Sequence, residues 1–379
     1  MSISVKERRA LRARRVRRCR RVAGLVLASI VGAILFALVG NTGGRHLASA
    51  TTTVPTTTTV PEKPRPKIPF TFVAGGDIAL NGEGANSATF AGIRQYLHGD
   101  LVFGNQEGVL ADGGTPKCAP YGVNSCYTFR GLPSSASGLA AAGFTAMSVA
   151  NNHALDYGAD AQRQTIAALS RAGIDHVGLP GEITVVRAGK VKVALVACAP
   201  YPWAQSLLDI PGSAALVRKA ATRADIVLVY MHAGAEGSSA SHVPYGEENA
   251  FGEDRGNPRA FTHAMIDAGA ALVFGSGPHT LRGLEWYRGH LIVYSLGNLA
   301  GNNTLSTSGW LSTTALLSLR LRSDGVFLSG KLIPLRLSTP GTPSPDPYET
   351  AITMIRSLSQ ADFGASAPSI ASDGTIAVP

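Results

Sequence analysis

The sequence predicts an α/β domain that is preceded by one N-terminal transmembrane helix. From residue 68 onward, short and almost continuously apolar runs alternate with amphipathic or alanine-rich stretches. Such alternation is typical of strands that helices cover on both faces. After residue 280 the pattern changes to strands separated by short turns, which indicates antiparallel pairing. A chain of 379 residues can bury a sizeable core, as one large domain or two.

The excess positive charge of the chain lies at its N-terminus. The whole chain carries a net charge of +9. Residues 1–21 hold ten basic side chains and one acidic side chain, which accounts for the entire excess. We therefore expect a basic cytoplasmic tail and a nearly neutral folded domain, with no nucleic-acid partner.

A charge-free apolar run of 19 residues follows the basic tail, over residues 22–40. A helix of about 20 apolar residues spans the hydrocarbon core of a bilayer. Because arginines flank only the N-terminal side of the run, we expect a single-pass protein of the cell membrane with an extracytoplasmic C-terminal domain. A cleaved signal peptide is the alternative, since Ala48-Ser49-Ala50 resembles a cleavage site, but the run is long for a signal.

Residues 41–69 are expected to be a linker, because Thr51 to Pro69 is rich in threonine and proline. Such a composition forms a semi-rigid spacer and no packed core. The folded domain is expected over residues 70–338. Residues 339–379 are expected to be a loosely packed C-terminal extension with one short helix near Thr350–Leu358.

The apolar runs and the amphipathic stretches define the expected elements. The strands of the α/β part are expected at Phe70–Ala74, Asp100–Phe103, Phe144–Ala150, Val191–Ala199, Asp225–Met231 and Ala270–Phe274. Its helices are expected at Ala159–Ala172, Ala214–Ala224 and Pro258–Ala268, and the later strands at Leu284–Tyr287, Leu291–Tyr294, Leu311–Leu319 and Val326–Ile333.

Two of the four cysteines flank a polar loop. An extracellular disulfide between Cys118 and Cys126 would close that loop. A zinc site there would need further Cys or His residues close by, and the sequence has none. Cys198 lies in an apolar run and is expected to be a buried small hydrophobe, whereas Cys19 lies in the cytoplasmic tail.

Polar side chains follow five of the predicted strands at their carboxyl ends, which is the edge where open α/β sheets bind ligands. Any one of these residues has a structural alternative. Asn151 and Asn152 could form a turn, and Asp156 could cap the next helix. Because five strands end in this way, a shared site is the better interpretation. The residues are Asp77, Glu107, Asn152, His153, Asp156, His232, Glu236 and His279.

The chemistry of these side chains indicates a metal centre. Oxygen and nitrogen ligands without a thiolate suit Mn, Zn, Fe or Mg. A cluster drawn from several strand ends is typical of a hydrolytic centre with one or two divalent ions. An unligated histidine in such a centre can donate a proton to the leaving group.

Several motifs resemble the CapA family of capsule-synthesis proteins, which includes poly-γ-glutamate synthesis proteins. They include F-V-A-G-G-D (72–77), A-N-N-H-A-L-D-Y-G (150–158) and Y-S-L-G-N (294–298), within a match from about residue 70 to about residue 335. That family is similar to the calcineurin-like metallophosphoesterases. The resemblance implies a metallophosphoesterase-like four-layer αββα sandwich, in which two face-to-face sheets lie between outer helices.

The resemblance also implies a role for each site residue. Glu236 would lie near the ligands or face the substrate, His153 would be the proton donor or transition-state stabiliser, and Asp156 would orient it. Two positions depart from the phosphoesterase pattern, because Ala79 and Ser276 stand where relatives often carry histidine. Glu285, Ser295 and Asn298 belong to family motifs, but the sequence assigns them no role. The implied metal ligands are Asp77, Glu107, Asn152, His232 and His279.

The implied function is a membrane-anchored role in the synthesis or export of a capsule or poly-γ-glutamate-like surface polymer. The polymer or its synthesis machinery would be the partner. One alternative is a metal-dependent hydrolase that acts on a phosphoester, ester or amide of the cell envelope. The other is a catalytically inactive polymer-binding scaffold, which the two missing imidazoles favour.

Overall fold

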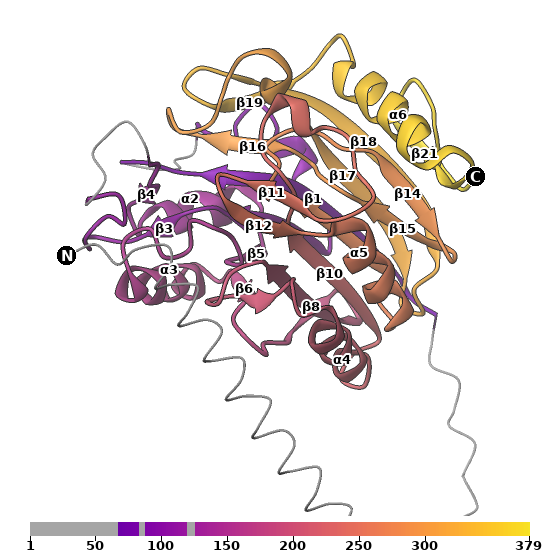
Figure 1. Ribbon diagram of the computed structural model, residues 1–379, viewed down its shortest axis with the longest axis horizontal. Helices are drawn as coiled ribbons and strands as arrows, with labels where there is room; N and C mark the ends of the chain where they lie inside the picture. Colours follow the sequence, from indigo (N-terminus) through magenta and orange to yellow (C-terminus); the bar gives the residue numbers. More distant parts are fainter. Residues whose placement is uncertain (1–66, 83–87, 120–125) are drawn as a thin grey trace, which may run out of the picture. The chain divides into compact units, whose positions relative to one another are not determined.

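The computed structural model of the protein describes residues 67–82, 88–119 and 126–379 (Figure 1). The predicted cytoplasmic tail at 1–21, the membrane helix at 22–40 and the linker up to residue 66 lie outside the described residues. Among the helices of the described part, none has the length and apolar character needed to cross a membrane.

The first of two large sheets has ten strands. Its central strands run parallel, and the strands toward the C-terminal end of the chain pair antiparallel. In spatial order it contains β20 (Ser369–Ile370), β21 (Thr375–Ala377), β18 (Phe327–Ser338), β17 (Thr313–Arg322), β1 (Pro69–Ala79), β2 (Leu101–Gln106), β5 (Ala146–Ser148) and β6 (Asp175–Val177), with β16 (Asn298–Gly301) beside β1 and β19 (Thr342–Pro345) beside β18.

The second large sheet has seven strands, of which the central four run parallel. In spatial order it contains β14 (Leu284–Tyr287), β15 (His290–Val293), β13 (Leu272–Ser276), β10 (Ile226–His232), β8 (Val191–Ala199) and β7 (Thr184–Ala188), with β9 (Gln205–Ser206) beside β8. Two small ribbons complete the strands: β3 (Val109–Leu110) with β4 (Arg130–Gly131), and β11 (Glu248–Ala250) with β12 (Glu253–Gly256).

The two large sheets pack face to face around one apolar core. Aromatic rings from both sheets meet there, because Phe103 of β2 lies 5.0 Å from Phe274 of β13 and 5.4 Å from Tyr230 of β10, measured between ring centroids. Phe72 of β1 lies 5.1 Å from the same Phe274 ring. Edge-to-face contacts of this kind stabilise a core beyond the burial of their area.

Helices cover the outer face of each sheet (Figure 1). On the second sheet, α4 (Ile210–Ala221) and α5 (Pro258–Asp267) bury Val217 and Phe261. On the first sheet, α2 (Ser135–Ala142) and α3 (Ala159–Arg171) bury Leu139 and Leu169. The described domain is therefore a mixed α/β fold with helix, sheet, sheet and helix layers. Short 3-10 turns lie at Arg94–Tyr96, Ser238–Ala240, Gly309–Ser312 and Gly364–Ser366.

The expected helices and strands occur with small shifts in their bounds. Side-chain caps explain two helix starts: Asn257 accepts a hydrogen bond from the Ala260 amide at 3.0 Å, and Asp209 accepts one from Gly212 at 3.1 Å. The expectation that all five polar strand ends lie on one sheet edge is wrong. β1, β2 and β5 belong to one sheet, whereas β10 and β13 belong to the other.

The expectation of a loosely packed C-terminal segment is also wrong. The segment forms α6 (Thr350–Phe363), which is longer than the predicted helix and packs against β14 and β18 (Figure 1). Ala351, Ile352, Ile355 and Leu358 enter the core between the two sheets. β21 then pairs with β18 and extends the first sheet. The polar composition of the segment concealed this helical spacing of apolar residues.

Replacing Ile355 with alanine should measure how firmly α6 is docked. The Ile355 side chain is fully buried, so its truncation leaves a cavity that should lower the free energy of unfolding by about 2–5 kcal/mol. Urea denaturation of the purified protein measures the change. Gln360→Ala, on the exposed face of the same helix, is the control and should change stability by less than about 0.5 kcal/mol. Equal, small effects of both substitutions would show that α6 does not depend on this contact.

Candidate metal centre

The carboxyl ends of the parallel strands of both sheets meet at one end of the fold. Asp77 of β1 is in register with Asn105 of β2, and His232 of β10 is in register with Ser276 of β13. The two sheets approach so closely that His232 Nδ1 lies 3.6 Å from Asp77 Oδ1. The site therefore lies between two sheets. Each polar residue lies at the carboxyl end of its strand, as the sequence predicts.

Asp77 is fully buried, and hydrogen bonds hold its carboxylate from several sides. Asn105 Nδ2 donates to Oδ1 at 2.8 Å, and the Gly277 amide donates to Oδ2 at 3.1 Å. The Ser276 hydroxyl also donates to Oδ1. Burial alone would raise the pKa of Asp77, but the contacts with His232 and His279 outweigh burial and hold it well below its usual range. Asp77 is therefore an anion at neutral pH.

Gly76 lets the backbone before Asp77 pass close to the backbone of Gly297. A Cβ on Gly76 would overlap with the carbonyl oxygen of Gly297. The Asp77 amide donates to that same oxygen at 3.0 Å. The close approach explains why the motif has glycine directly before the aspartate.

Glu107 lies in the same cluster, but its carboxylate lacks hydrogen bonds. Its side chain is fully buried, and neither oxygen has a hydrogen-bond partner among the described residues. The imidazole atoms nearest Oε1 are His279 Nε2 at 3.5 Å and His232 Nε2 at 3.7 Å. Burial raises the pKa of Glu107 well above its usual range, although the charge of His279 acts in the opposite direction. A buried carboxylate without donors is costly unless a cation compensates it.

His279 faces both carboxylates from the second sheet. Its Nδ1 lies 2.8 Å from Asn298 Oδ1 and 3.3 Å from Asp77 Oδ2, so the Nδ1 hydrogen points at these acceptors and Nε2 faces Glu107. Burial would lower the pKa of His279, but the charges of Glu107 and Asp77 outweigh burial and raise it to about 10. The cluster therefore holds protons at neutral pH that a divalent cation would displace.

His232 and Asn152 complete the cluster. His232 is fully buried, and its Nε2 lies 2.9 Å from Asn152 Oδ1. Burial lowers the pKa of His232, which favours the neutral imidazole that binds metals. The structure thus brings all five predicted ligands together.

These residues fit a divalent cation. Ligand atoms of Asp77, Glu107 and His279 all lie within 4.8 Å of one another. The oxygens of Glu107 provide two buried acceptor atoms that have no hydrogen-bond partner among the described residues. A mixture of carboxylate, amide and imidazole ligands suits Mn, Zn or Fe.

Glu236 lies at the rim of the cluster and pairs with an arginine from the β11–β12 hairpin. Glu236 Oε1 lies 2.7 Å from Arg255 Nη1, and Glu236 Oε2 lies 3.8 Å from His279 Nε2. Asn152 Nδ2 donates to Glu236 Oε1 at 3.4 Å. Glu236 thus links the ligand cluster to Arg255.

His153 and Asp156 form a pair beside the metal ligands. His153 Nδ1 lies 2.8 Å from Asp156 Oδ2, which also accepts the Phe129 amide at 2.6 Å. Lys117 Nζ lies 2.8 Å from the other oxygen, Asp156 Oδ1. Asp156 does not cap the following helix, whose N-cap residue is Gly158. The bond at Nδ1 leaves Nε2 of His153 free of Asp156 for proton transfer.

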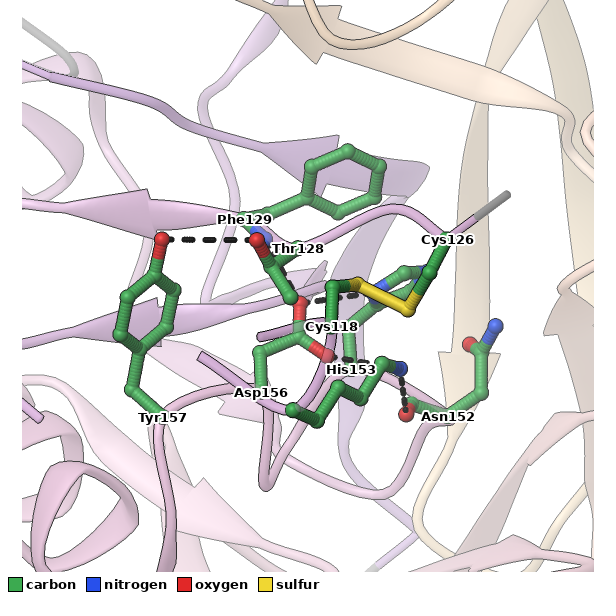
Figure 2. Close-up of a disulfide and its surroundings, with 9 residues drawn as sticks. Cys118, Cys126, Thr128, Phe129, Asn152, His153, Asp156 and Tyr157 are labelled. Carbon is green, nitrogen blue, oxygen red and sulfur yellow. Dashed lines mark hydrogen bonds and ion pairs between the residues drawn. A yellow bond between two sulfur atoms is a disulfide. The ribbon is translucent and has the colours of Figure 1, made fainter. Parts of the chain in front are cut away.

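A disulfide braces this pair from one side, as Figure 2 shows. Cys118 and Cys126 are bonded, which confirms the predicted bridge. Residues on both sides of the bridge contact the pair. Lys117, which precedes Cys118, pairs with Asp156, and the Phe129 ring lies tilted against His153 with 4.2 Å between ring centroids. Cys198 is buried and free, as predicted.

A cavity of about 450 Å³ opens above the centre. Asn152, His153, Glu236 and Arg255 all line it, together with Lys117. A substrate in this cavity would contact His153 of the pair and Asn152 of the predicted ligands at the same time.

Four residues contribute to the centre without having been assigned a role from the sequence. Asn105 follows a predicted strand, so its position was a signal, and it orients Asp77. Asn298 orients His279, and the Ser276 hydroxyl donates to Asp77. No sequence pattern indicated a role for Arg255, because it lies far from any predicted strand end. Glu285 and Ser295 lie outside the cluster, where Glu285 bonds His263 and Tyr294, and Ser295 bonds Thr280.

Comparisons with known proteins place the site residues within the domain of one protein family. Residues 71–303 match the model of the family described as "Bacterial capsule synthesis protein PGA_cap". The capsule biosynthesis protein CapA of Bacillus anthracis is 32% identical over 229 residues, which are 54% of this chain and 50% of that protein. The PGA biosynthesis protein CapA of Bacillus subtilis is 28% identical over 201 residues, which are 48% of each.

The chain thus spans about half the length of these curated relatives. Among solved structures, a 5'-nucleotidase precursor from Thermus thermophilus is similar with a TM-score of 0.41 and 14% identity. That similarity covers 78% of this chain and 59% of the nucleotidase.

Removal of the unpartnered carboxylate should weaken cation binding. Glu107→Gln keeps the size of the side chain and removes its charge, so the affinity for Mn²⁺ or Zn²⁺ should fall at least about tenfold. Equilibrium dialysis followed by elemental analysis measures bound metal. Glu285→Gln removes a buried carboxylate outside the cluster and serves as the matched control. Equal metal content in wild type and Glu107→Gln would contradict the assignment.

Proposed function

Because the chain belongs to the bacterial capsule synthesis protein family PGA_cap, we propose that it acts in the synthesis or export of a capsule-type surface polymer. The observation that carries this proposal is that the family match, residues 71–303, contains every residue of the metal centre. The relatives named as capsule and PGA biosynthesis proteins support a poly-γ-glutamate-like polymer.

The domain acts outside the cell on a single-pass membrane anchor. The apolar run at 22–40 and the basic residues before it support this topology. The Cys118–Cys126 disulfide also supports it, since disulfides persist in oxidising compartments.

The centre works as a metal-dependent hydrolase site of the metallophosphoesterase type. Face-to-face sheets with ligands at the strand ends support this interpretation. Asp77, Glu107, Asn152, His232 and His279 would hold the cation, which would supply Lewis-acid activation of the scissile group when bound.

The proton-donor pair has a separate task. Asp156 holds Nδ1 of His153, so Nε2 can carry the proton that the leaving group needs. Burial lowers the pKa of His153 despite the opposing effect of Asp156, so the imidazolium form gives up its Nε2 proton readily, although less of that form is present at neutral pH. Such general acid catalysis contributes typically about 10²–10⁴-fold.

A catalytically inactive scaffold is the second candidate. Ala79 and Ser276 favour it, because neither residue supplies the imidazole that phosphoesterases commonly use. In this case the domain would bind polymer or partner proteins, and the buried cluster would serve the fold alone.

Complementation of a deletion strain distinguishes the candidates. Deletion of the gene should reduce surface polymer, and the wild-type gene should restore it. His153→Ala removes the proton donor without removing a predicted ligand, so it should restore little polymer although an immunoblot shows normal protein. Full restoration of polymer by both His153→Ala and Asp77→Ala would favour the inactive scaffold over the hydrolase. Unchanged polymer in the deletion strain would refute a role in polymer synthesis or export. Glu285→Gln is the control.

A further inference from the structure

We propose that Arg255 forms an oxyanion-binding subsite beside the metal centre and binds a phosphate or carboxylate group of the substrate. This inference deepens the proposed function and rests on it, since it names the chemical group that the cavity recognises. It depends on the placement of one arginine, on the unpaired edge of its guanidinium group and on the anchoring of the hairpin that carries it.

Arg255 is buried, and only one of its terminal nitrogens is paired. The side chain is 1% exposed. Nη1 lies 2.7 Å from Glu236 Oε1 and 3.6 Å from Glu253 Oε2. Nε and Nη2 have no hydrogen-bond partner among the described residues. Buried donors of a charged group are costly to leave unpaired.

The two unpaired nitrogens share one edge of the guanidinium plane. The hydrogens on Nε and Nη2 point in parallel, which is the arrangement that binds a carboxylate or phosphate through two hydrogen bonds. Glu236 engages the other end of the group, at Nη1. The carboxylate thus fixes the orientation of the guanidinium, while the Nε and Nη2 donors stay buried and unpaired.

The position of Arg255 fits a substrate contact. The residue lines the 450 Å³ cavity with Asn152 and His153. Glu236 connects it to the cluster, because Glu236 Oε1 lies 2.7 Å from Arg255 Nη1 and Glu236 Oε2 lies 3.8 Å from His279 Nε2. A group bound beside Arg255 would therefore lie close to the residues that would hold the cation.

The hairpin that carries Arg255 is firmly anchored. Glu248 of β11 accepts two hydrogen bonds from Arg282, at 2.8 and 2.7 Å, and both side chains are buried. The carbonyl oxygen of Arg255 accepts the Gly234 amide at 3.0 Å, next to the end of β10. Because the backbone is held on both sides, the guanidinium group is preorganised, which reduces the entropic cost of binding.

Calorimetry with two probe anions tests the subsite. Inorganic phosphate and glutarate are titrated into the full-length chain, with and without Mn²⁺. Arg255→Met should weaken binding of at least one probe about tenfold to a hundredfold, since hydrogen bonds to charged groups are lost. Arg255→Lys keeps the charge and loses the bidentate edge, so it should bind with intermediate affinity. Loss confined to phosphate indicates a phosphoester substrate, and loss confined to glutarate indicates a carboxylate-bearing one.

The control is Arg259→Met, which removes a half-buried arginine that bonds Val243 and Asp362 and does not line the cavity. Its anion affinities should equal those of the wild type. Metal content is measured separately for each variant, so failure of the metal centre is distinguished from failure of the subsite. Equal anion affinities of wild type, Arg255→Met and Arg255→Lys would overturn the proposal, as would a wild type that binds neither probe.

Discussion

The buried carboxylate of Glu107 is the constraint on which the site depends. Its two oxygens have no hydrogen-bond donor among the described residues. The neighbouring ligand side chains, in contrast, are held in place by hydrogen bonds. Asp77 has three donors, and Asn298 orients His279. An anion without donors in a dry site destabilises the fold unless a cation or a proton neutralises it. The surrounding ligands favour a divalent cation for this role.

The two face-to-face sheets explain how this anion is enclosed. The first sheet supplies Asp77 and Glu107, and the second supplies His232 and His279, so the ligands meet only when the core between the sheets is formed. The packing of Phe103 against Tyr230 and Phe274 lies in that core. Binding of a metal would therefore be coupled to folding, since the ligand set does not exist in the unfolded chain. The disulfide fixes a further part of the rim, beside His153.

The sequence predicted which side chains meet in the cluster, because an apolar run that stops abruptly at Asp, Asn or His marks a strand end. It could not assign the strands to two sheets, since periodicity reports burial and does not identify the neighbour. It also missed the docking of α6, where Ile355 and Leu358 lie among polar residues. Arg255 escaped notice because only tertiary structure brings the β11–β12 hairpin to Glu236. The roles of Asn298 and Ser276 likewise required the geometry.

Anomalous X-ray diffraction from zinc-soaked crystals tests the central claim most directly. A single ion, or a close pair, should appear with ligand atoms of Asp77, Glu107 and His279 at about 2.0–2.2 Å. Its occupancy should fall in crystals of Glu107→Gln. An anomalous map without a peak at these residues, while Glu107 remains without donors, would contradict the metal centre.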